Sequence, residues 1–169
     1  MAVPAQKLKE AVLLNEFHSA MSLAAMTLGA SNSKAAQGGN IAIIDVRLQG
    51  KSVFREPAFS NSSSLPKAIK ADFAPSVPPA HLGRVGIPNG NQHANHTEPK
   101  LFDLFKTKLP SLGGGFDEII IASERDCCAS CLKHTIDAIT ALVALSNMSS
   151  VTSIKFYVVE INSWRAREA

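Results

Sequence analysis

Hydrophobic residues recur at helical spacing in three segments of the chain. They form one stripe over about residues 5–28, which Gly29 ends, and similar stripes over about 97–109 and 128–146. Pro99 suits the first turn of the second segment, where its missing N–H is not needed. The stripe positions are Leu13, Phe17, Met21, Ala24 and Leu28, then Leu101, Leu104, Phe105 and Leu109, then Leu132, Ile136, Ile139 and Val143. We therefore expect three helices, each with one buried face.

Shorter apolar runs between these segments predict strands. Ile41 to Leu48 and Ser52 to Phe59 flank Gln49-Gly50, a pair typical of a tight turn, so a β-hairpin is expected. Residues 118–122 (Glu-Ile-Ile-Ile-Ala) are too apolar for a sheet edge, and residues 154–161 are apolar on both faces. The order helix, strand, strand, helix, strand, helix, strand predicts an α/β protein. Its mixed central sheet would lie between two helical layers, in a three-layer α/β/α architecture.

Length and composition indicate one domain over residues 1–169. A hydrophobic content of 46% is enough for a packed core. No apolar run reaches the roughly 18 residues of a membrane-spanning helix, and charged residues interrupt the N-terminal segment where a signal peptide would be apolar. We expect no membrane association and no signal peptide. The net charge of +3 permits a nucleic-acid partner without requiring one.

The segment over about 60–95 has no repeating hydrophobic pattern. It holds five prolines and a run of Ser and Asn, with at most a short turn of helix near residues 66–71. A connection of this length inside a compact domain is usually functional. This one leads directly to a histidine, His96.

Two short clusters carry the candidate chemistry, and each lies at the expected start of a helix. The first is His96-Thr97-Glu98 and the second is Cys128-Ala129-Ser130-Cys131. Zinc-dependent base deaminases bind Zn²⁺ with one imidazole and two thiolates, and a water takes the fourth position. The two cysteines would point the same way from a helix N-terminus, where the helix dipole favours thiolate.

We therefore predict His96, Cys128 and Cys131 as zinc ligands. Glu98 is two residues from His96, so it would lie beside the zinc-bound water and act as the catalytic proton shuttle rather than as a ligand. The predicted reaction is hydrolytic removal of an exocyclic amine from a nucleobase.

Two other functions use parts of the same pattern. A Cys-x-x-Cys at a helix start is also the redox arrangement of thioredoxins. This chain lacks the strand-helix-strand unit that precedes the cysteines in that fold, and a redox pair leaves His96 and Glu98 unexplained. A structural zinc site in an interaction module needs a fourth protein ligand, which Cys127 could supply.

The two clusters together resemble a known family. His96-Thr97-Glu98-Pro99-Lys100-Leu101 and Ser123-Glu124-Arg125-Asp126-Cys127-Cys128-Ala129-Ser130-Cys131 are similar to motifs of bacterial polymorphic-toxin deaminase domains, a branch of the cytidine-deaminase-like superfamily. The resemblance spans roughly residues 41–160. Cys127 stands where the family usually has proline. We favour Cys128 over Cys127 as the ligand, because it keeps a spacing of two residues between the ligands.

The resemblance implies several properties of the chain. The fold would be cytidine-deaminase-like, the bound metal would be Zn²⁺, and the reaction would be mutagenic deamination of cytosine in nucleic acid. It also implies a toxin domain at the C-terminus of a larger secreted or translocated effector, acting in the cytoplasm of the target cell. An immunity protein would be its partner in the producing cell.

Candidate substrate contacts lie near the two clusters. Ser123, Glu124 and Arg125 would line the base pocket, as in relatives of this fold. Loop aromatics can stack on an extruded base, for which Phe73 and Phe116 are the candidates. His93 could contact the substrate, and phosphates could be met by Lys67, Lys70, Arg84 and Lys100.

We expect conversion of cytosine to uracil in single-stranded DNA. Double-stranded DNA, RNA and free nucleosides or nucleotides remain alternative substrates, because the sequence does not identify the polymer. Adenine remains an alternative base, since adenine deaminases use the same ligand set.

Overall fold

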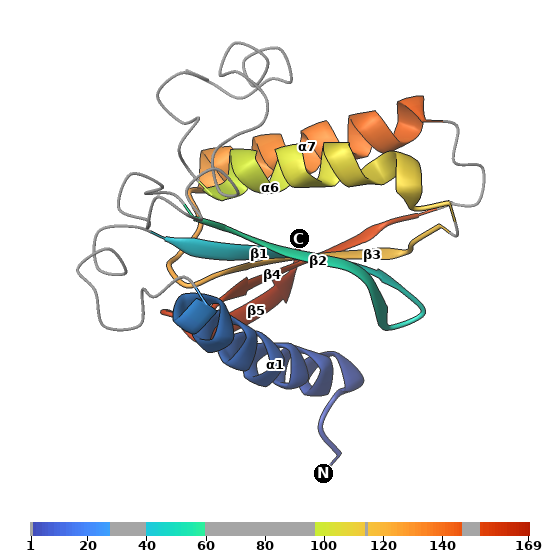
Figure 1. The fold of residues 1–169 in the computed structure, drawn as a ribbon. Helices are drawn as coiled ribbons and strands as arrows, with labels where there is room; N and C mark the ends of the chain where they lie inside the picture. Colours follow the sequence, from blue (N-terminus) through green and yellow to red (C-terminus); the bar gives the residue numbers. More distant parts are fainter. Residues whose placement is uncertain (1, 28–39, 60–96, 114, 147–152) are drawn as a thin grey trace.

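A computed structural model describes residues 2–27, 40–59, 97–113, 115–146 and 153–169 (Figure 1). In chain order the elements are α1 (Ala5–Thr27), β1 (Ile41–Leu48), β2 (Lys51–Phe59), α6 (Thr97–Lys108), the 3₁₀ turn η3 (Leu109–Ser111), β3 (Glu118–Ser123), α7 (Ala129–Leu145), β4 (Lys155–Glu160) and β5 (Arg165–Glu168). Within the described residues, the predicted helices and strands lie where the hydrophobic pattern puts them. The possible turn of helix near residues 66–71 lies outside the described residues.

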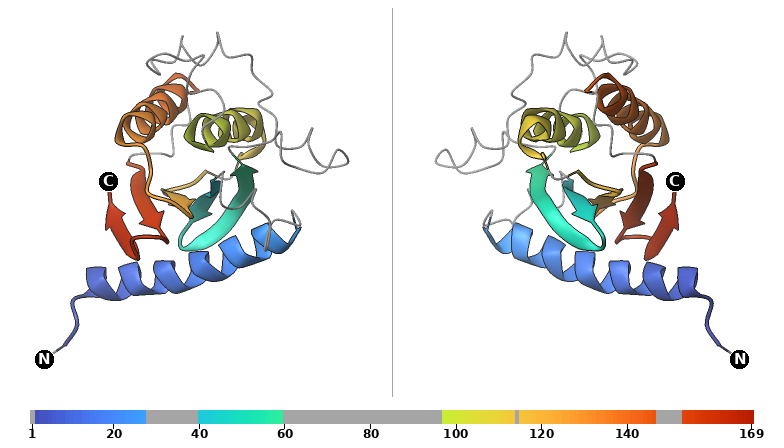
Figure 2. Two further views of the ribbon diagram at one scale, coloured as in Figure 1. Left: turned by 90° about the vertical axis from the view of Figure 1, so that its left-hand side faces the viewer. Right: turned by 90° about the vertical axis from the view of Figure 1, so that its right-hand side faces the viewer.

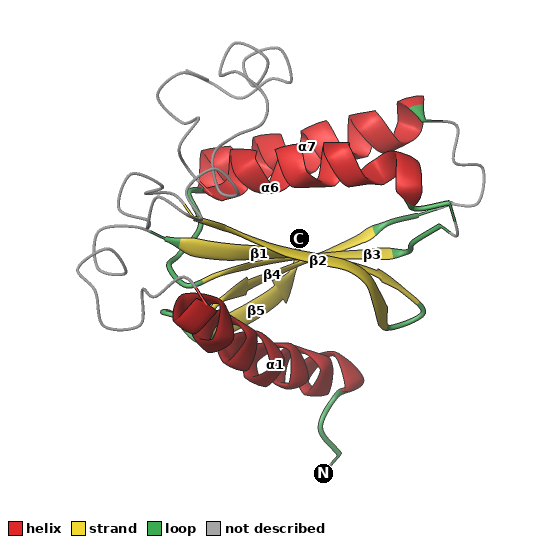
Figure 3. Ribbon diagram, viewed as in Figure 1, coloured by secondary structure: helices red, strands yellow, loops and turns green. Residues whose placement is uncertain are grey.

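The five strands form one mixed sheet in the order β2-β1-β3-β4-β5. β3 and β4 are parallel, and the other neighbouring pairs are antiparallel. α1 covers one face of the sheet, and α6 and α7 lie side by side on the other (Figures 2 and 3). The prediction of an α/β protein with a mixed sheet between helical layers is confirmed. β3 is a central strand, as its apolar sequence predicts.

One strand was not predicted. Residues 165–168, for which the hydrophobic pattern predicted no element, form β5 and pair antiparallel with β4. Only Ala166 of this Arg-Ala-Arg-Glu segment is buried. Such a short polar sequence has no hydrophobic alternation to reveal it, and its strand conformation depends on hydrogen bonds to the neighbouring strand.

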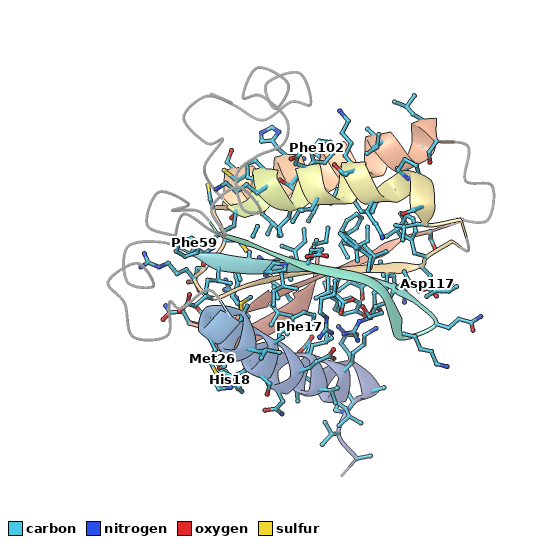
Figure 4. The ribbon with its side chains drawn as sticks, viewed as in Figure 1. Phe17, His18, Met26, Phe59, Phe102 and Asp117 are labelled. Atoms are coloured by element: carbon cyan, nitrogen blue, oxygen red, sulfur yellow. The ribbon has the colours of Figure 1, made fainter. Side chains whose placement is uncertain are left out.

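The β1–β2 connection is the predicted tight turn. Gln49 and Gly50 both have positive φ, 51° and 79°, which matches the twist of a two-residue hairpin turn. The carboxylate of Asp117 accepts a hydrogen bond from the Gln49 backbone N–H at 3.2 Å, and Asp117 lies beside this turn in Figure 4. This turn lies at the opposite end of β1 from the predicted catalytic residues.

The sheet separates two hydrophobic clusters. The cluster under α6 and α7 includes Leu101, Phe105, Phe116, Ile119, Ile121, Leu132, Ile139 and Val158. The cluster under α1 includes Leu13, Phe17, Met21, Ile41, Ile43, Ile120, Tyr157 and Val159. Alternate residues of β3 enter opposite clusters, which explains why its sequence is a continuous apolar run.

Charged residues join α1 to the sheet beside the second cluster. Asp45 of β1 is fully buried and accepts hydrogen bonds from Arg47, Arg55 and Ser52. Both arginines also pair with Glu16 of α1. Their guanidinium groups lie near the ring of Phe17, which points from α1 toward the sheet, whereas His18 and Met26 point away from it (Figure 4). The position of α1 therefore depends on polar as well as apolar contacts.

Replacing the buried carboxylate should be costly. Asp45→Ala leaves Arg47 and Arg55 with Glu16 as their shared partner and removes the fully buried one, and breaking a buried pair typically costs about 3–5 kcal/mol of unfolding free energy. Asp137→Ala breaks only the exposed Lys133–Asp137 pair and should change stability by no more than about 0.5 kcal/mol. Denaturant unfolding of both variants measures the difference. Equally small losses of unfolding free energy in the two variants would show that the Asp45 cluster does not stabilise the fold more than an exposed ion pair does.

Candidate functional site

The predicted catalytic residues belong to segments that meet at the edge of the sheet where β3 and β4 end. Because β3 and β4 are parallel, their last residues Ser123 and Glu160 lie opposite one another. β1 is antiparallel to β3, so it begins at this edge, where Ala42 pairs with Ser123. The carboxyl ends of parallel strands are the usual place for a site in such a sheet.

Glu98 lies in the first turn of α6 and is 4% exposed. Its Oε1 accepts a hydrogen bond from the backbone N–H of Cys128 at 3.1 Å. Its Oε2 lies 3.3 Å from the hydroxyl of Thr97, which can donate to it. The predicted proton shuttle thus contacts the predicted ligand Cys128 from a helix 30 residues earlier in the sequence.

The two predicted cysteine ligands lie at the start of α7. Cys128 is the N-cap residue, with an extended backbone, and Cys131 lies in the first turn. Burial raises the pKa of the Cys131 thiol to about 12, with further contributions from a hydrogen bond to Cys128 and the negative charge of Glu98. Burial thus opposes the thiolate form of Cys131, whereas a helix N-terminus favours it.

Cys127 occupies different surroundings from its two neighbours. Its thiol hydrogen-bonds with Ser123, and the side chain packs against the core under α6 and α7. Its backbone N–H donates to Oε1 of Glu160 at 3.0 Å. Burial, followed by the charges of Glu98 and Glu160, raises the pKa of this thiol to about 12.

Glu160 is a functional candidate that sequence analysis missed. It is 1% exposed, and Arg165 of β5 donates two hydrogen bonds to its Oε2. Its other oxygen holds the backbone of Cys127, so β4 and β5 together support the segment that carries the cysteines. A charged residue at the end of an otherwise apolar strand was the available signal, because parallel strand ends share an edge with a site.

Asn40, just before β1, is the second residue that was missed. Its side-chain amide donates to the hydroxyls of Thr97 at 2.9 Å and Ser123 at 2.8 Å. Its carbonyl oxygen accepts from the backbone N–H of Arg125 at 3.0 Å. An asparagine before a strand is common in turns, so the sequence alone carried no functional signal here.

The three residues predicted to line a base pocket differ in exposure. Ser123 is fully buried and hydrogen-bonded to Asn40, whereas Arg125 is exposed. Glu124 is partly buried, and burial raises the pKa of its carboxyl group. Its Oε2 is buried with no hydrogen-bond partner among the described residues. All three lie at the site edge, on or just after the end of β3.

Two expected substrate contacts are wrong. Phe116 is 2% exposed and packs edge-to-face against Phe105 in the core, because the segment before β3 turns beneath α6. Lys100 is 3% exposed and its Nζ donates to the backbone carbonyl of Phe59 at 2.6 Å. Neither side chain is available to a base or a phosphate.

The structure does not describe every predicted residue. His96 lies outside the described residues, as does the whole 60–95 segment, which includes His93, Phe73, Lys67, Lys70 and Arg84. Among the described residues, no group of three or more His, Cys, Asp or Glu side chains could hold a metal ion. Glu98, Cys128 and Cys131 are brought together, and the predicted third ligand belongs to the part of the chain that is not described.

Comparison with known proteins adds no family to this picture. Neither the family models nor the curated proteins nor the solved structures contain a match to the chain. In the part of the chain that the structure describes, no helix combines the length and apolarity needed to cross a membrane.

The buried lysine predicts a specific pH dependence of stability. Burial lowers the pKa of Lys100 from 10.5 to about 8, so between these values the unfolded chain binds more protons than the folded chain. The contribution of Lys100 to unfolding free energy should therefore rise with pH across this window. When unfolding free energy is measured with denaturant from pH 7 to 10.5, the Lys100→Met variant should lack the rise that wild type shows. The exposed-site control Lys133→Met should keep it, and a Lys100→Met curve parallel to wild type would contradict the pKa shift.

Proposed function

We propose that this protein is a zinc-dependent hydrolytic deaminase that converts cytosine to uracil in nucleic acid, with single-stranded DNA as its preferred substrate. The observation that carries the proposal is the 3.1 Å hydrogen bond from the Cys128 backbone to Glu98. It joins the two sequence clusters that the chemistry requires. A thioredoxin-like redox pair would leave His96, two residues before Glu98, unexplained.

The side chains at the site fit a zinc ion by their chemistry. Two thiols that hydrogen-bond to each other suit a borderline-soft cation. Cys128, Cys131 and His96 would hold the ion, and His96 directly precedes Thr97 in the sequence. When bound, Zn²⁺ acts as a Lewis acid and lowers the pKa of a coordinated water toward about 7.

Glu98 would carry the protons of the reaction. Its carboxylate takes a proton from the attacking water and delivers one to the ring nitrogen of the base. The remaining hydroxide adds to the ring carbon. The carboxylate then takes the proton of the new hydroxyl group and delivers it to the exocyclic nitrogen, so the bond from the ring carbon to this nitrogen breaks and ammonia leaves. Burial of Glu98 keeps bulk water from competing for these transfers.

The second candidate function is a zinc-stabilised interaction module with Cys127 as fourth ligand. The surroundings of Cys127 favour the deaminase instead. Its thiol hydrogen-bonds with Ser123, and its side chain packs against the core. The thiols of Cys128 and Cys131 instead hydrogen-bond with each other. These contacts support Cys128 over Cys127 as the ligand.

The biological context is proposed on the sequence resemblance alone. It is a toxin domain of a larger effector, delivered to a target cell and neutralised by an immunity protein in the producing cell.

Incubating the purified protein with single- and double-stranded DNA and RNA, then sequencing for C-to-T or A-to-G changes, tests both the reaction and the base. Free cytidine and adenosine belong in the same assay.

Removing the proton shuttle should abolish turnover without removing the metal. Glu98→Gln keeps an oxygen for the Cys128 N–H but cannot shuttle protons, and Glu98→Ala removes both functions. Each should lower the deamination rate by at least about a hundredfold, because acid–base catalysis contributes about 10²–10⁴. Zinc content should match wild type in both variants, and thermal unfolding should match wild type in Glu98→Gln. Loss of zinc in Glu98→Gln would identify Glu98 as a ligand and refute its assignment as a shuttle.

Replacing a ligand should lower zinc occupancy and stability together, since metal binding is coupled to folding. We expect this for Cys131→Ala, Cys128→Ala and His96→Ala, measured by metal analysis and thermal unfolding. Cys127→Ala should retain zinc and serves as the matched control. If Cys127→Ala loses the metal while Cys128→Ala retains it, the ligand assignment is wrong by one residue.

Single-stranded DNA should be deaminated faster than duplex DNA. Turning a base out of a duplex costs a few kcal/mol of unstacking, which an unpaired base avoids. Phosphate contacts by basic residues should make the rate fall as salt rises. Rates on matched single- and double-stranded oligonucleotides at several salt concentrations measure both effects. Equal or faster turnover of the duplex, or turnover of free cytidine alone, would contradict this substrate assignment.

A further inference from the structure

The amide group of Asn40 has only one orientation that fits its neighbours. The backbone N–H of Arg125 can only donate, so the Asn40 atom 3.0 Å from it is the carbonyl oxygen. The amide nitrogen must then face the hydroxyls of Thr97 and Ser123, at 2.9 and 2.8 Å. The hydrogen-bonding network itself therefore fixes the direction of this side chain.

This orientation determines what the Thr97 hydroxyl can do. An amide nitrogen only donates, so the oxygen of Thr97 accepts from Asn40 and its own proton is left for another acceptor. Oε2 of Glu98 lies 3.3 Å away in the required direction. Glu98 thus receives a donor at each oxygen, from Thr97 at Oε2 and from the Cys128 backbone at Oε1.

We propose that Asn40 is a positioning residue that acts through Thr97 to hold the Glu98 carboxylate in place for proton transfer. The proposal rests on the proposed deaminase function, because it assigns a support to the proton shuttle of that reaction. Asn40 is suited to this role by its place in the fold. It precedes β1 and bonds both to the first turn of α6 and to the segment after β3, the two parts of the chain that carry Glu98 and the cysteines.

The test uses substitutions that change hydrogen-bond direction with little change in shape. Asn40→Asp keeps an acceptor for Arg125 but presents only acceptors to Thr97, whose proton then turns away from Glu98. Thr97→Val removes the hydroxyl without changing side-chain size. Each should lower kcat about tenfold, the equivalent of one lost hydrogen bond, with KM changed less than about twofold and zinc content unchanged.

The double variant separates positioning from charge. If Asn40 acts through Thr97, Asn40→Asp should lower kcat no further in the Thr97→Val background. A loss that persists in the double variant would assign the effect to the added charge and overturn the proposal. So would a larger change in KM than in kcat, which would indicate substrate contact. Thr140→Val, on the exposed side of α7, is the hydroxyl-deletion control and should leave kcat unchanged.

A measurement that needs no activity distinguishes this proposal from the proposed function. A loosened Glu98 carboxylate should make the Cys128 amide proton of Asn40→Asp exchange with solvent up to about tenfold faster. The Lys155 amide, bonded to Asp117 at the far end of the sheet, should not change. This pattern in a protein without deaminase activity would refute the function and keep the positioning contact. If Asn40→Asp does not fold, unchanged kcat or unchanged Cys128 exchange in Thr97→Val would overturn the proposal.

Discussion

The parallel pairing of β3 with β4 is the constraint on which the arrangement of this molecule depends. Parallel strands cannot be joined by a tight turn, so the chain must cross over, and α7 is that crossover. Both strands then end at the same edge, and α7 begins there with its cysteines. The antiparallel β1 starts at this edge as well, which brings in Asn40. The pairings of β3 with β4 and of β1 with β3 thus bring the ends of β3 and β4, the start of α7 and Asn40 to one edge.

Burying several polar groups at this edge would destabilise the fold if they lacked partners. The structure supplies partners for these groups, with the exception, among the described residues, of Oε2 of Glu124. Glu98 is bonded at both oxygens, Glu160 pairs with Arg165 and holds the Cys127 backbone, and Ser123 is bonded to Asn40. Apolar residues at these positions would be simpler to accommodate. The polar groups are better explained by a reaction at the site than by stability, which is why we relate them to deamination.

The sequence predicted the parts of the fold that hydrophobic periodicity controls. The three helices, the hairpin and the central strand all bury apolar faces, so their spacing is visible in the residues. β5 was missed because it has only four residues, three of them polar, and gains strand structure from a neighbour. Phe116 and Lys100 were misassigned because the exposure of a side chain in a loop or in the first turn of a helix depends on which other parts of the chain pack against it. Asn40 and Glu160 were missed because their contacts join segments far apart in the chain.

The proposed deaminase requires a zinc ion held by two cysteines and one histidine beside Glu98. X-ray absorption at the zinc edge of the purified protein measures the ligands directly. We predict two sulfur atoms at about 2.3 Å and two nitrogen or oxygen atoms at about 2.0–2.1 Å, one of them from water. A shell with three sulfur atoms would make Cys127 a ligand and the site structural. A protein that binds no zinc would contradict the account entirely.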